Sequence, residues 1–220
     1  MNASNLKLAM VTGASRGLGC AMAEALATRG FHIIAIARTT GALEELDDRI
    51  QAAGGHATLA PLDLSNNDAL AQICHAIHGR WGKIDLLVHA AIHAPPLTPV
   101  PHIDARDLEK TLSGNITATA QLITNTDPLL RASPGGAAIF FDDPVEAQNF
   151  HATYGLSKAA QMRLARSWQA ESAKSGPKIH IATPGPMPTA TRARFYPGED
   201  RTKLSDCASE AARILDEIGI

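Results

Sequence analysis

The sequence predicts an α/β protein with one parallel β-sheet covered by helices on both faces. Short apolar runs alternate with longer helical stretches, and glycines stand between each helical stretch and the next apolar run. The first apolar run also leads directly into a glycine-rich turn that opens a helix. At 220 residues, with 45% apolar and 19% charged residues, the chain can bury one large core. We therefore expect a single doubly wound domain over residues 1–220.

The elements are expected in strict alternation. The runs rich in aliphatic and β-branched residues predict six strands, at residues 8–11, 33–36, 57–59, 86–88, 137–141 and 179–182. Helical spacing predicts helices at residues 16–29, 42–52, 68–78, about 105–130, 154–175 and 205–218. After Pro184 the pattern weakens. We expect a lid-like loop over 190–204 and a C-terminal helix within 205–220, with no seventh strand.

Charge and composition exclude several classes of partner. The formal net charge of −2 leaves no basic excess for a phosphate backbone, and no apolar stretch approaches the roughly 20 residues of a membrane-spanning helix. Cys20, Cys74 and Cys207 are scattered and odd in number, so we expect reduced thiols. The start of the chain is polar and does not resemble a secretion signal. These observations predict a cytoplasmic protein that binds neither nucleic acid nor membrane.

The glycine-rich turn spans residues 12–19, with glycines at 13, 17 and 19. A strand that ends in such a turn and opens a helix directs backbone N–H groups and the positive end of the helix dipole at one point, where a pyrophosphate can bind. Gly19 would also let the helix pack closely on the strand. The spacing differs from the common Gly-x-Gly-x-x-Gly dinucleotide pattern. The alternative is a glycine turn without a ligand.

Residues near the ends of the second and third strands bear on the choice of cofactor. Where an acidic residue would bind the ribose diol of NAD, this chain has Ala37 followed by Arg38. Arg38 and Arg16 can both face the adenosine ribose, and a guanidinium suits a 2′-phosphate, so NADP(H) is favoured. Two ordinary solvated arginines are the alternative. Asp63 either contacts the adenine or is a turn residue before a helix capped by Ser65.

A tyrosine and a lysine stand four residues apart at Tyr154 and Lys158, which places them on one face of a predicted helix. A phenol ionises near pH 10 in model peptides, so a tyrosine that exchanges a proton near neutral pH needs a neighbour that favours its anion. The Lys158 ammonium is expected to lower the pKa of Tyr154 in this way. A half-buried aromatic beside a surface lysine is the alternative.

Together these residues resemble the short-chain dehydrogenase/reductase family, over about residues 6–189. The glycine turn, the segment 81–88, the Tyr154/Lys158 pair and the segment 184–189 follow the order of the family's motifs. The resemblance implies a Rossmann-type fold, a small-molecule substrate, and catalytic roles for Tyr154, Lys158 and Asn115, whose carbonyl would anchor a relay water. It also implies cofactor contacts from Gly13, Ser15, Arg16, Gly17, Leu18, Gly19, Arg38, Asp63, Leu64, Ala90, Ala91, Tyr154, Lys158, Pro184, Gly185 and Thr189.

Asn115 follows Gly114 inside an otherwise strong helical pattern. Both are poor helix formers, and a local exception of this kind often marks a functional site. A simple helix kink or a surface amide is the alternative.

The chain departs from the family where a serine normally donates a hydrogen bond to the substrate oxygen. Ungapped counting places Phe141 there, and alignment of the strand end places Asp142 or Asp143 there. An ionised carboxylate cannot donate that bond and would oppose the negative charge that grows on a carbonyl oxygen during reduction. Only a protonated aspartic acid could donate that hydrogen bond in place of the serine. Otherwise the two aspartates are solvated loop residues.

Two further departures concern the fourth strand and the end of the chain. His89-Ala90-Ala91-Ile92 stands where the family usually has Asn-Asn-Ala-Gly. His89 and His93 do not predict a metal site, because they leave a strand for a Pro-rich loop and no further ligands converge on them. The short C-terminal part lacks the strand that often builds a tetramer in the family. We expect a homodimer joined through the helices after the fourth and fifth strands.

The sequence thus favours an NADP(H)-dependent reductase of carbonyls, or dehydrogenase of alcohols, that is weakened by the loss of the serine. The alternative is a non-catalytic NADP(H)-binding protein that acts as a sensor, scaffold or partner subunit.

Overall fold

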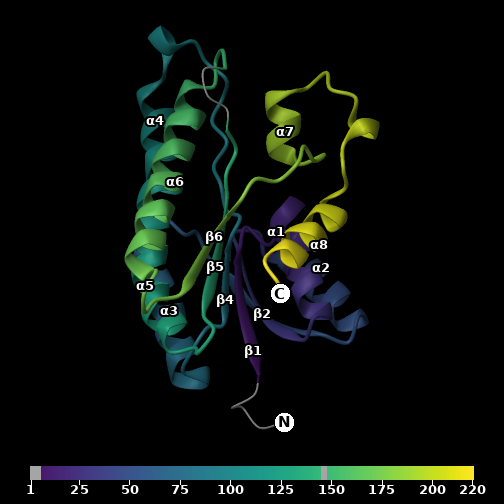
Figure 1. Cartoon of the computed structure of the whole chain (residues 1–220). Coiled ribbons are helices and arrows are strands. Elements are labelled where there is room, and N and C mark those ends of the chain that lie inside the picture. Colours follow the sequence, from purple (N-terminus) through teal and green to yellow (C-terminus); the bar gives the residue numbers. More distant parts are fainter. Residues whose placement is uncertain (1–5, 145–147) are drawn as a thin grey trace.

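A parallel β-sheet forms the centre of the protein in a computed structural model that describes residues 6–144 and 148–220 (Figure 1). Among these residues the sheet has six strands in the order β3-β2-β1-β4-β5-β6, as expected. The strands are β1 (Lys7–Thr12), β2 (Phe31–Ala37), β3 (His56–Pro61), β4 (Leu86–His89), β5 (Ala137–Phe141) and β6 (Lys178–Ala182). The predicted doubly wound α/β fold is confirmed.

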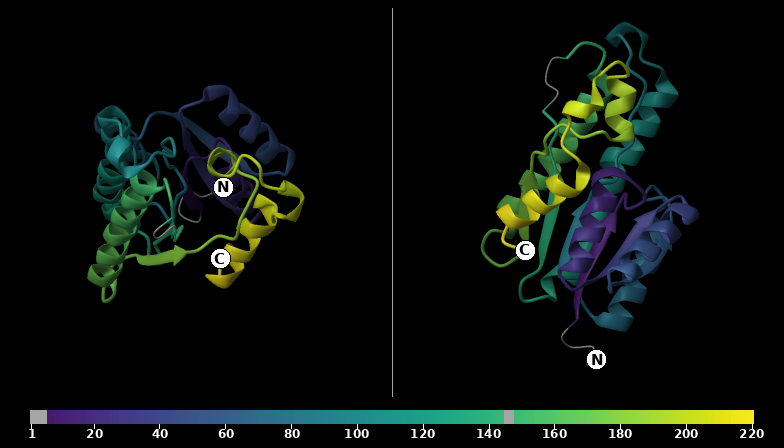
Figure 2. Two further views of the ribbon diagram at one scale, coloured as in Figure 1. Left: turned by 90° about the horizontal axis from the view of Figure 1, so that it is seen from above. Right: turned by 90° about the vertical axis from the view of Figure 1, so that its right-hand side faces the viewer.

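Helices cover both faces of this sheet (Figure 1). One layer consists of α1 (Gly17–Thr28), α2 (Thr40–Ala52) and α8 (Cys207–Glu217), with α8 lying beside α1 (Figure 2). The other consists of α3 (Asn67–Trp81), α4 (Ala105–Leu112), α5 (Ala118–Arg131) and α6 (Ala152–Ser172). A short helix, α7 (Ala190–Phe195), stands apart from both layers, and single 3₁₀ turns span Val100–His102 and Arg201–Lys203.

The central strands are mostly apolar because both of their faces are buried. In β1, Ala9 and Val11 point into the core beneath α1, α2 and α8, whereas Leu8 and Met10 point into the core beneath α3, α5 and α6. This alternation follows from the two-residue period of a strand. The two cores hold the sheet rigid, and so they fix where its loops emerge.

The order of the strands creates a switch point between β1 and β4. From β1 the chain first adds β2 and β3 on one side, and then crosses to add β4, β5 and β6 on the other. The connections after β1 and β4 therefore diverge at the carboxyl edge of the sheet and leave a crevice, which is the general ligand position in open α/β sheets.

Two expected elements differ in detail. The single helix predicted over 105–130 is interrupted by a π-helical segment, Ser113–Thr117. Gly114 and Asn115 are poor helix formers, and the Asn115 side chain makes its hydrogen bonds to His93, outside the helix. Asn66, not Ser65, caps α3 by accepting a hydrogen bond from the Ala69 N–H, while Ser65 bonds to Asp63. The lid-like loop contains α7.

No helix in the described residues is both long enough and apolar enough to cross a membrane.

Candidate active site

A cavity of about 400 Å³ opens at the carboxyl edge of the sheet, over the switch point. Its walls come from the loops after β1, β2, β3, β4, β5 and β6 and from α6 and α7. Every residue for which the sequence predicts a cofactor contact lines this cavity. Segments far apart in the chain, such as the glycine turn and Tyr154, thus meet at one site.

The glycine turn is packed so tightly that side chains are excluded from it. Gly13 and Gly17 have positive φ angles of 69° and 58°. A Cβ on Gly19 would lie 2.4 Å from the Gly13 carbonyl oxygen, and one on Gly13 would lie 2.7 Å from the Ala91 nitrogen. At Gly17 a Cβ would reach Thr189 at 3.3 Å, across the cavity wall. Glycine is therefore required here for close backbone approach.

The start of α1 fits an anionic ligand. Arg16 is the N-cap residue, its side chain makes no capping hydrogen bond, and the described first turn of α1 contains no acidic side chain. The first N–H groups of a helix have no partner inside the helix. Because those of α1 border the cavity and carry the positive end of the helix dipole, the residues present fit the pyrophosphate of a dinucleotide.

Arg38 and Asp63 stand together at the far end of the cavity. Their side chains form an ion pair of 3.7 Å, and Asp63 also accepts two hydrogen bonds from Ser65. Both side chains are largely exposed. The Arg38 guanidinium is therefore held only by an exposed ion pair, and Asp63 forms a turn with Ser65 while it also lines the cavity.

Tyr154 lies at the other end of the cavity, near the start of α6, and is 3% exposed. Its hydroxyl donates a hydrogen bond of 2.8 Å to Asp143 Oδ2. Burial raises the pKa of Tyr154 above its ordinary value, and the Asp143 carboxylate raises it further. The expectation that Lys158 lowers this pKa is not met in this structure, because the polar partner of the phenol is an acidic group.

Lys158 lies one turn further along α6 and is directed into the protein. Its ammonium donates hydrogen bonds of 2.7 Å to the Phe141 carbonyl and 2.8 Å to Gln161 Oε1. Burial lowers its pKa to about 8, and the carboxylates of Asp143 and Asp142 offset part of that effect. Lys158 is thus a nearly buried cation held by a carbonyl and an amide.

Asn115 lies in the π-helical segment and is fully buried, behind the cavity wall. Its side-chain amide accepts from the His93 N–H at 2.7 Å and donates to the His93 carbonyl and to Ser157 Oγ, both at 2.9 Å. Asn115 therefore ties the loop after β4 to α6. Its main-chain carbonyl accepts from Thr119 Oγ1 at 2.7 Å and from Gln161 Nε2 at 3.5 Å.

His89 is the centre of a buried polar network that sequence reasoning did not find. Its ring nitrogens contact Thr12 Oγ1 at 2.8 Å and Thr119 Oγ1 at 2.9 Å, and Gln161 Nε2 lies 3.2 Å from the second nitrogen. Burial lowers the pKa of His89 to about 3, and the Lys158 charge adds to this effect. A neutral histidine thus links the end of β1 to the amide that holds Lys158.

The residues after the Pro-Gly segment form a cover over Tyr154. Thr189 caps α7, and Phe195 at its end packs edge-on against the Tyr154 ring, with centroids 4.8 Å apart. The Arg192 guanidinium donates to Glu199 at 2.6 and 2.5 Å. This cover presents the apolar ring of Phe195 to Tyr154, and its Arg192 guanidinium is hydrogen-bonded to the Glu199 carboxylate.

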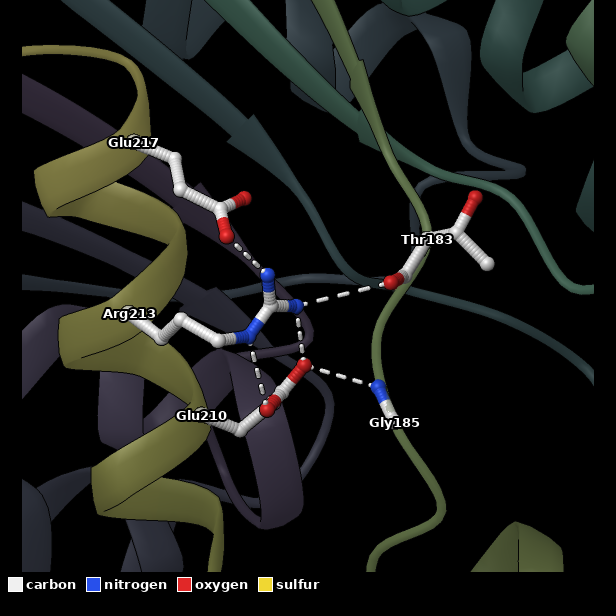
Figure 3. Close-up of polar contacts among 5 residues, drawn as sticks. All are labelled: Thr183, Gly185, Glu210, Arg213 and Glu217. Atoms are coloured by element: carbon white, nitrogen blue, oxygen red, sulfur yellow. Dashed lines mark hydrogen bonds and ion pairs between the residues drawn. The ribbon is translucent and has the colours of Figure 1, made fainter.

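Side chains of the C-terminal helix α8 contact the segment that follows β6 (Figure 3). Glu210 on α8 accepts a hydrogen bond of 2.7 Å from the Gly185 N–H and pairs with Arg213, which also contacts Glu217 and the Thr183 carbonyl. Glu210 is buried. Only the tertiary contact identifies this role, because the sequence pattern of α8 is that of an ordinary amphipathic helix.

Comparisons with known proteins identify the family of the chain. The profile of the short chain dehydrogenase family matches residues 7–200. The fatty acyl-CoA reductase of Acinetobacter baylyi is 31% identical over 80% of this chain and 60% of its own length, and the 2,3-dihydro-2,3-dihydroxybenzoate dehydrogenase of Bacillus subtilis is 28% identical over 91% and 78%. The chain thus spans less than two thirds of the length of the Acinetobacter enzyme.

Solved structures share the overall fold. A short chain dehydrogenase from Pseudomonas syringae superposes with a TM-score of 0.90 at 26% identity, covering 97% of this chain and 91% of that one. A metagenomic short-chain oxidoreductase in complex with NADP superposes with a TM-score of 0.81 at 25% identity, covering 94% and 88%.

Proposed function

Because the chain belongs to the short-chain dehydrogenase/reductase family, we propose that it is an NADP(H)-dependent oxidoreductase that reduces a carbonyl, or oxidises the corresponding alcohol, on a small molecule. The observation that carries the proposal is the single cavity that joins the glycine turn to Tyr154 and Lys158. A bound nicotinamide coenzyme supplies hydride chemistry at this place. The glycine turn and the start of α1 would hold its pyrophosphate, and Thr189 would contact its carboxamide.

The choice of NADP(H) over NAD(H) is supported by Arg38 and Arg16, which border the adenosine end of the cavity. A guanidinium matches a 2′-phosphate in shape and charge. The relative that carries NADP in its crystal structure supports the same choice. Asp63 opposes it only weakly, because its side chain is largely exposed and water screens its charge.

The protein's own residues limit the rate of carbonyl reduction. In this proposal Tyr154 is the proton donor, and Lys158 and Asn115 hold the helix and loop that position it. We expect the Asp143 carboxylate, which contacts Tyr154, to stand in for the serine donor of the family. Loss of one donor to a developing oxyanion costs about 10² to 10³ in turnover. We therefore expect slow reduction of ketones and aldehydes.

The proposal is tested with Tyr154→Phe and nucleotide titration. The wild-type protein is expected to bind NADPH more tightly than NADH and to turn over a ketone slowly. In Tyr154→Phe, turnover is expected to fall by at least about 10², while the NADPH dissociation constant stays near that of wild type. Arg38→Asp is expected to shift the preference toward NADH. If the wild-type protein binds neither coenzyme in calorimetry, the proposed function is wrong.

The same measurements address a non-catalytic role, which the Tyr154–Asp143 hydrogen bond favours because it engages the only proton of the phenol. Tight NADPH binding without turnover of any carbonyl or imine substrate would establish a sensor or scaffold function.

We also propose that the protein forms a homodimer through α4, α5 and α6. A shallow groove on α4 and the π-helical segment is lined by Ala105, Leu108, Glu109, Leu112, Ser113 and Thr117, and the side chain of Leu156 on α6 is 54% exposed. Leucines on the surface of packed helices favour burial against a second copy.

A further inference from the structure

We propose that the reacting group of the substrate is a positively charged carbon–nitrogen double bond, an iminium, and that Asp143 selects it. This inference rests on the proposed NADP(H)-dependent function and names the substrate class of that site. Its basis is the polarity of the space beside Tyr154, where the carboxylate of Asp143 lies 2.8 Å from the tyrosine hydroxyl.

The first step of the argument is the pattern of donors and acceptors. The Tyr154 hydroxyl donates its only hydrogen to Asp143, so the phenol presents lone pairs to the cavity. An ionised carboxylate also accepts hydrogen bonds and donates none. A carbonyl oxygen, which needs a donor, therefore meets two acceptors. A protonated imine carries an N–H donor, which matches both of them.

The second step is charge. Asp142 and Asp143 are neighbours with different environments, because Asp142 pairs with Arg166 at 2.9 Å. For Asp143, the described residues place no lysine, arginine or histidine nitrogen within the 4.0 Å of an ion pair. The nearby Arg192 gives its hydrogen bonds to Glu199. Asp143 is thus a half-buried carboxylate without a direct ion-pair partner among the described residues. The cations that line the same cavity are engaged elsewhere, Lys158 by Phe141 and Gln161 and Arg192 by Glu199, so a cationic ligand would give Asp143 a direct partner.

The third step concerns the apolar side chains that line the same cavity as the Asp143 carboxylate. Phe195 covers the Tyr154 ring, and Met187 and Ile92 also line the cavity. Apolar side chains near the Asp143 carboxylate suit a ring or chain that carries a single protonated nitrogen, because burial near hydrocarbon strengthens the attraction between opposite charges.

The redox step balances with the proposed coenzyme. Two electrons and one hydrogen pass as hydride from the reduced nicotinamide coenzyme to the iminium carbon, the electron pair of the C=N π bond becomes the nitrogen lone pair, and the coenzyme is oxidised. The product is a neutral amine, which takes up a proton and binds Asp143 as an ammonium. A carboxylate beside the nitrogen raises the pKa of a bound imine, so a larger fraction is in the reactive, protonated form. A carbonyl oxygen would instead develop negative charge beside Asp143.

The test uses a bicyclic pair of ligands that differ in charge, the amine tetrahydroisoquinoline and the alcohol 2-tetralol, with 3,4-dihydroisoquinoline and 2-tetralone as the substrates. Binding of the amine and the alcohol to the NADP⁺ complex is measured by calorimetry, independently of turnover. We expect the amine to bind the wild-type complex more tightly than the alcohol. Asp143→Asn is expected to weaken amine binding about 10- to 100-fold and alcohol binding by less than about threefold.

Asp143→Ser keeps the site small and introduces the donor that a carbonyl requires. It is expected to weaken amine binding as Asp143→Asn does, to lower reduction of the imine, and to raise reduction of the ketone by about 10². Asp142→Asn is the control, because it removes the same charge one residue away. It is expected to change amine binding by less than about threefold.

The outcomes separate the two proposals. If the wild-type protein fails to bind NADPH, the proposed function and this inference are both overturned. If NADPH binds and Asp143→Asn leaves amine binding unchanged, or lowers it no more than Asp142→Asn does, the inference alone is overturned.

Discussion

One side-chain contact sets the polarity of this site. The chain brings the Asp143 carboxylate to the tyrosine hydroxyl at 2.8 Å. The phenol and the acid then share one hydrogen, so neither donates freely to a carbonyl. The side of the cavity at Tyr154 is therefore rich in hydrogen-bond acceptors, and this bears on which substrates can react.

The buried Lys158 affects the stability of the folded protein. Its ammonium is almost fully buried, and its two hydrogen bonds go to a neutral carbonyl and a neutral amide. Burial lowers its pKa from 10.5 to about 8, although the carboxylates of Asp143 and Asp142 act in the opposite direction. The folded state therefore loses this proton before the unfolded chain does.

The stability of the protein is expected to depend on pH through Lys158. Below pH 8 the lysine is charged in both states, and its burial destabilises the folded state in full. Between about pH 8 and 10.5 the unfolded chain binds more protons than the folded one, so the free energy of unfolding rises with pH. Urea unfolding of wild type and Lys158→Met measures this. We expect their difference in unfolding free energy to change by about 3 kcal/mol across the interval, in favour of wild type at high pH.

A difference that stays constant from pH 7 to 10 would contradict this assignment. The subtraction removes the contributions of other groups that titrate in the same range, because both proteins contain them.

At the scale of the elements, two of them hold the loops of the site in place. The π-helical segment between α4 and α5 turns Asn115 toward His93 and Ser157, and so joins the loop after β4 to α6. The second is α8, whose Glu210 holds the Gly185 N–H while Arg213 reaches the Thr183 carbonyl. Both elements fasten loops, which are otherwise the least constrained parts of a sheet's edge.

Glu210→Ala tests whether the contact between α8 and the Gly185 N–H stabilises the protein. It leaves the Gly185 N–H and the Arg213 guanidinium without their shared carboxylate, and should lower the free energy of unfolding by about 2 kcal/mol and weaken NADPH binding. Glu217→Ala removes an exposed partner of the same arginine and is the matched control, with an expected loss below about 1 kcal/mol and unchanged NADPH affinity. Equal effects in the two variants would refute a special role for Glu210. Urea unfolding and calorimetry supply the two readouts.

At the scale of the whole molecule, the doubly wound order of strands concentrates distant residues at one edge. Thr12 and His89 end neighbouring strands and touch each other, although 77 positions separate them. The same edge collects the glycine turn, Tyr154 and the segment around Gly185. The proposed dimer surface lies on the helical layer that contains α4 and α6, at the groove on α4 and at the exposed Leu156 on α6.

Leu108→Glu is expected to separate the proposed dimer into monomers, because it places a charge in the apolar groove on α4. Sedimentation velocity measures the mass directly. Ala52→Glu adds the same charge on the exposed end of α2, in the other helical layer, and is expected to leave the mass at that of wild type. A wild-type protein that sediments as a monomer at micromolar concentration would rule out the dimer.

Much of the fold follows from local patterns. The alternation of apolar runs and helical spacing, with glycines between them, is enough to predict a parallel sheet covered on both faces, because each pattern reflects the period of one element. The glycine turn and the Tyr154/Lys158 pair are equally local, since the residues of each lie within one turn or one helix. Their placement in one cavity then follows from the topology of the sheet.

What only the tertiary structure decided are the partners of each side chain across the sheet edge. No spacing in the sequence shows that Asp143 rather than Asp142 meets Tyr154, that Gln161 holds Lys158, or that Glu210 reaches Gly185. These contacts depend on where loops and helices from separate parts of the chain come to rest. The local sequence determines the elements and their order, whereas packing in three dimensions determines which charges and hydrogen-bonding groups face one another, and therefore the chemistry of the site.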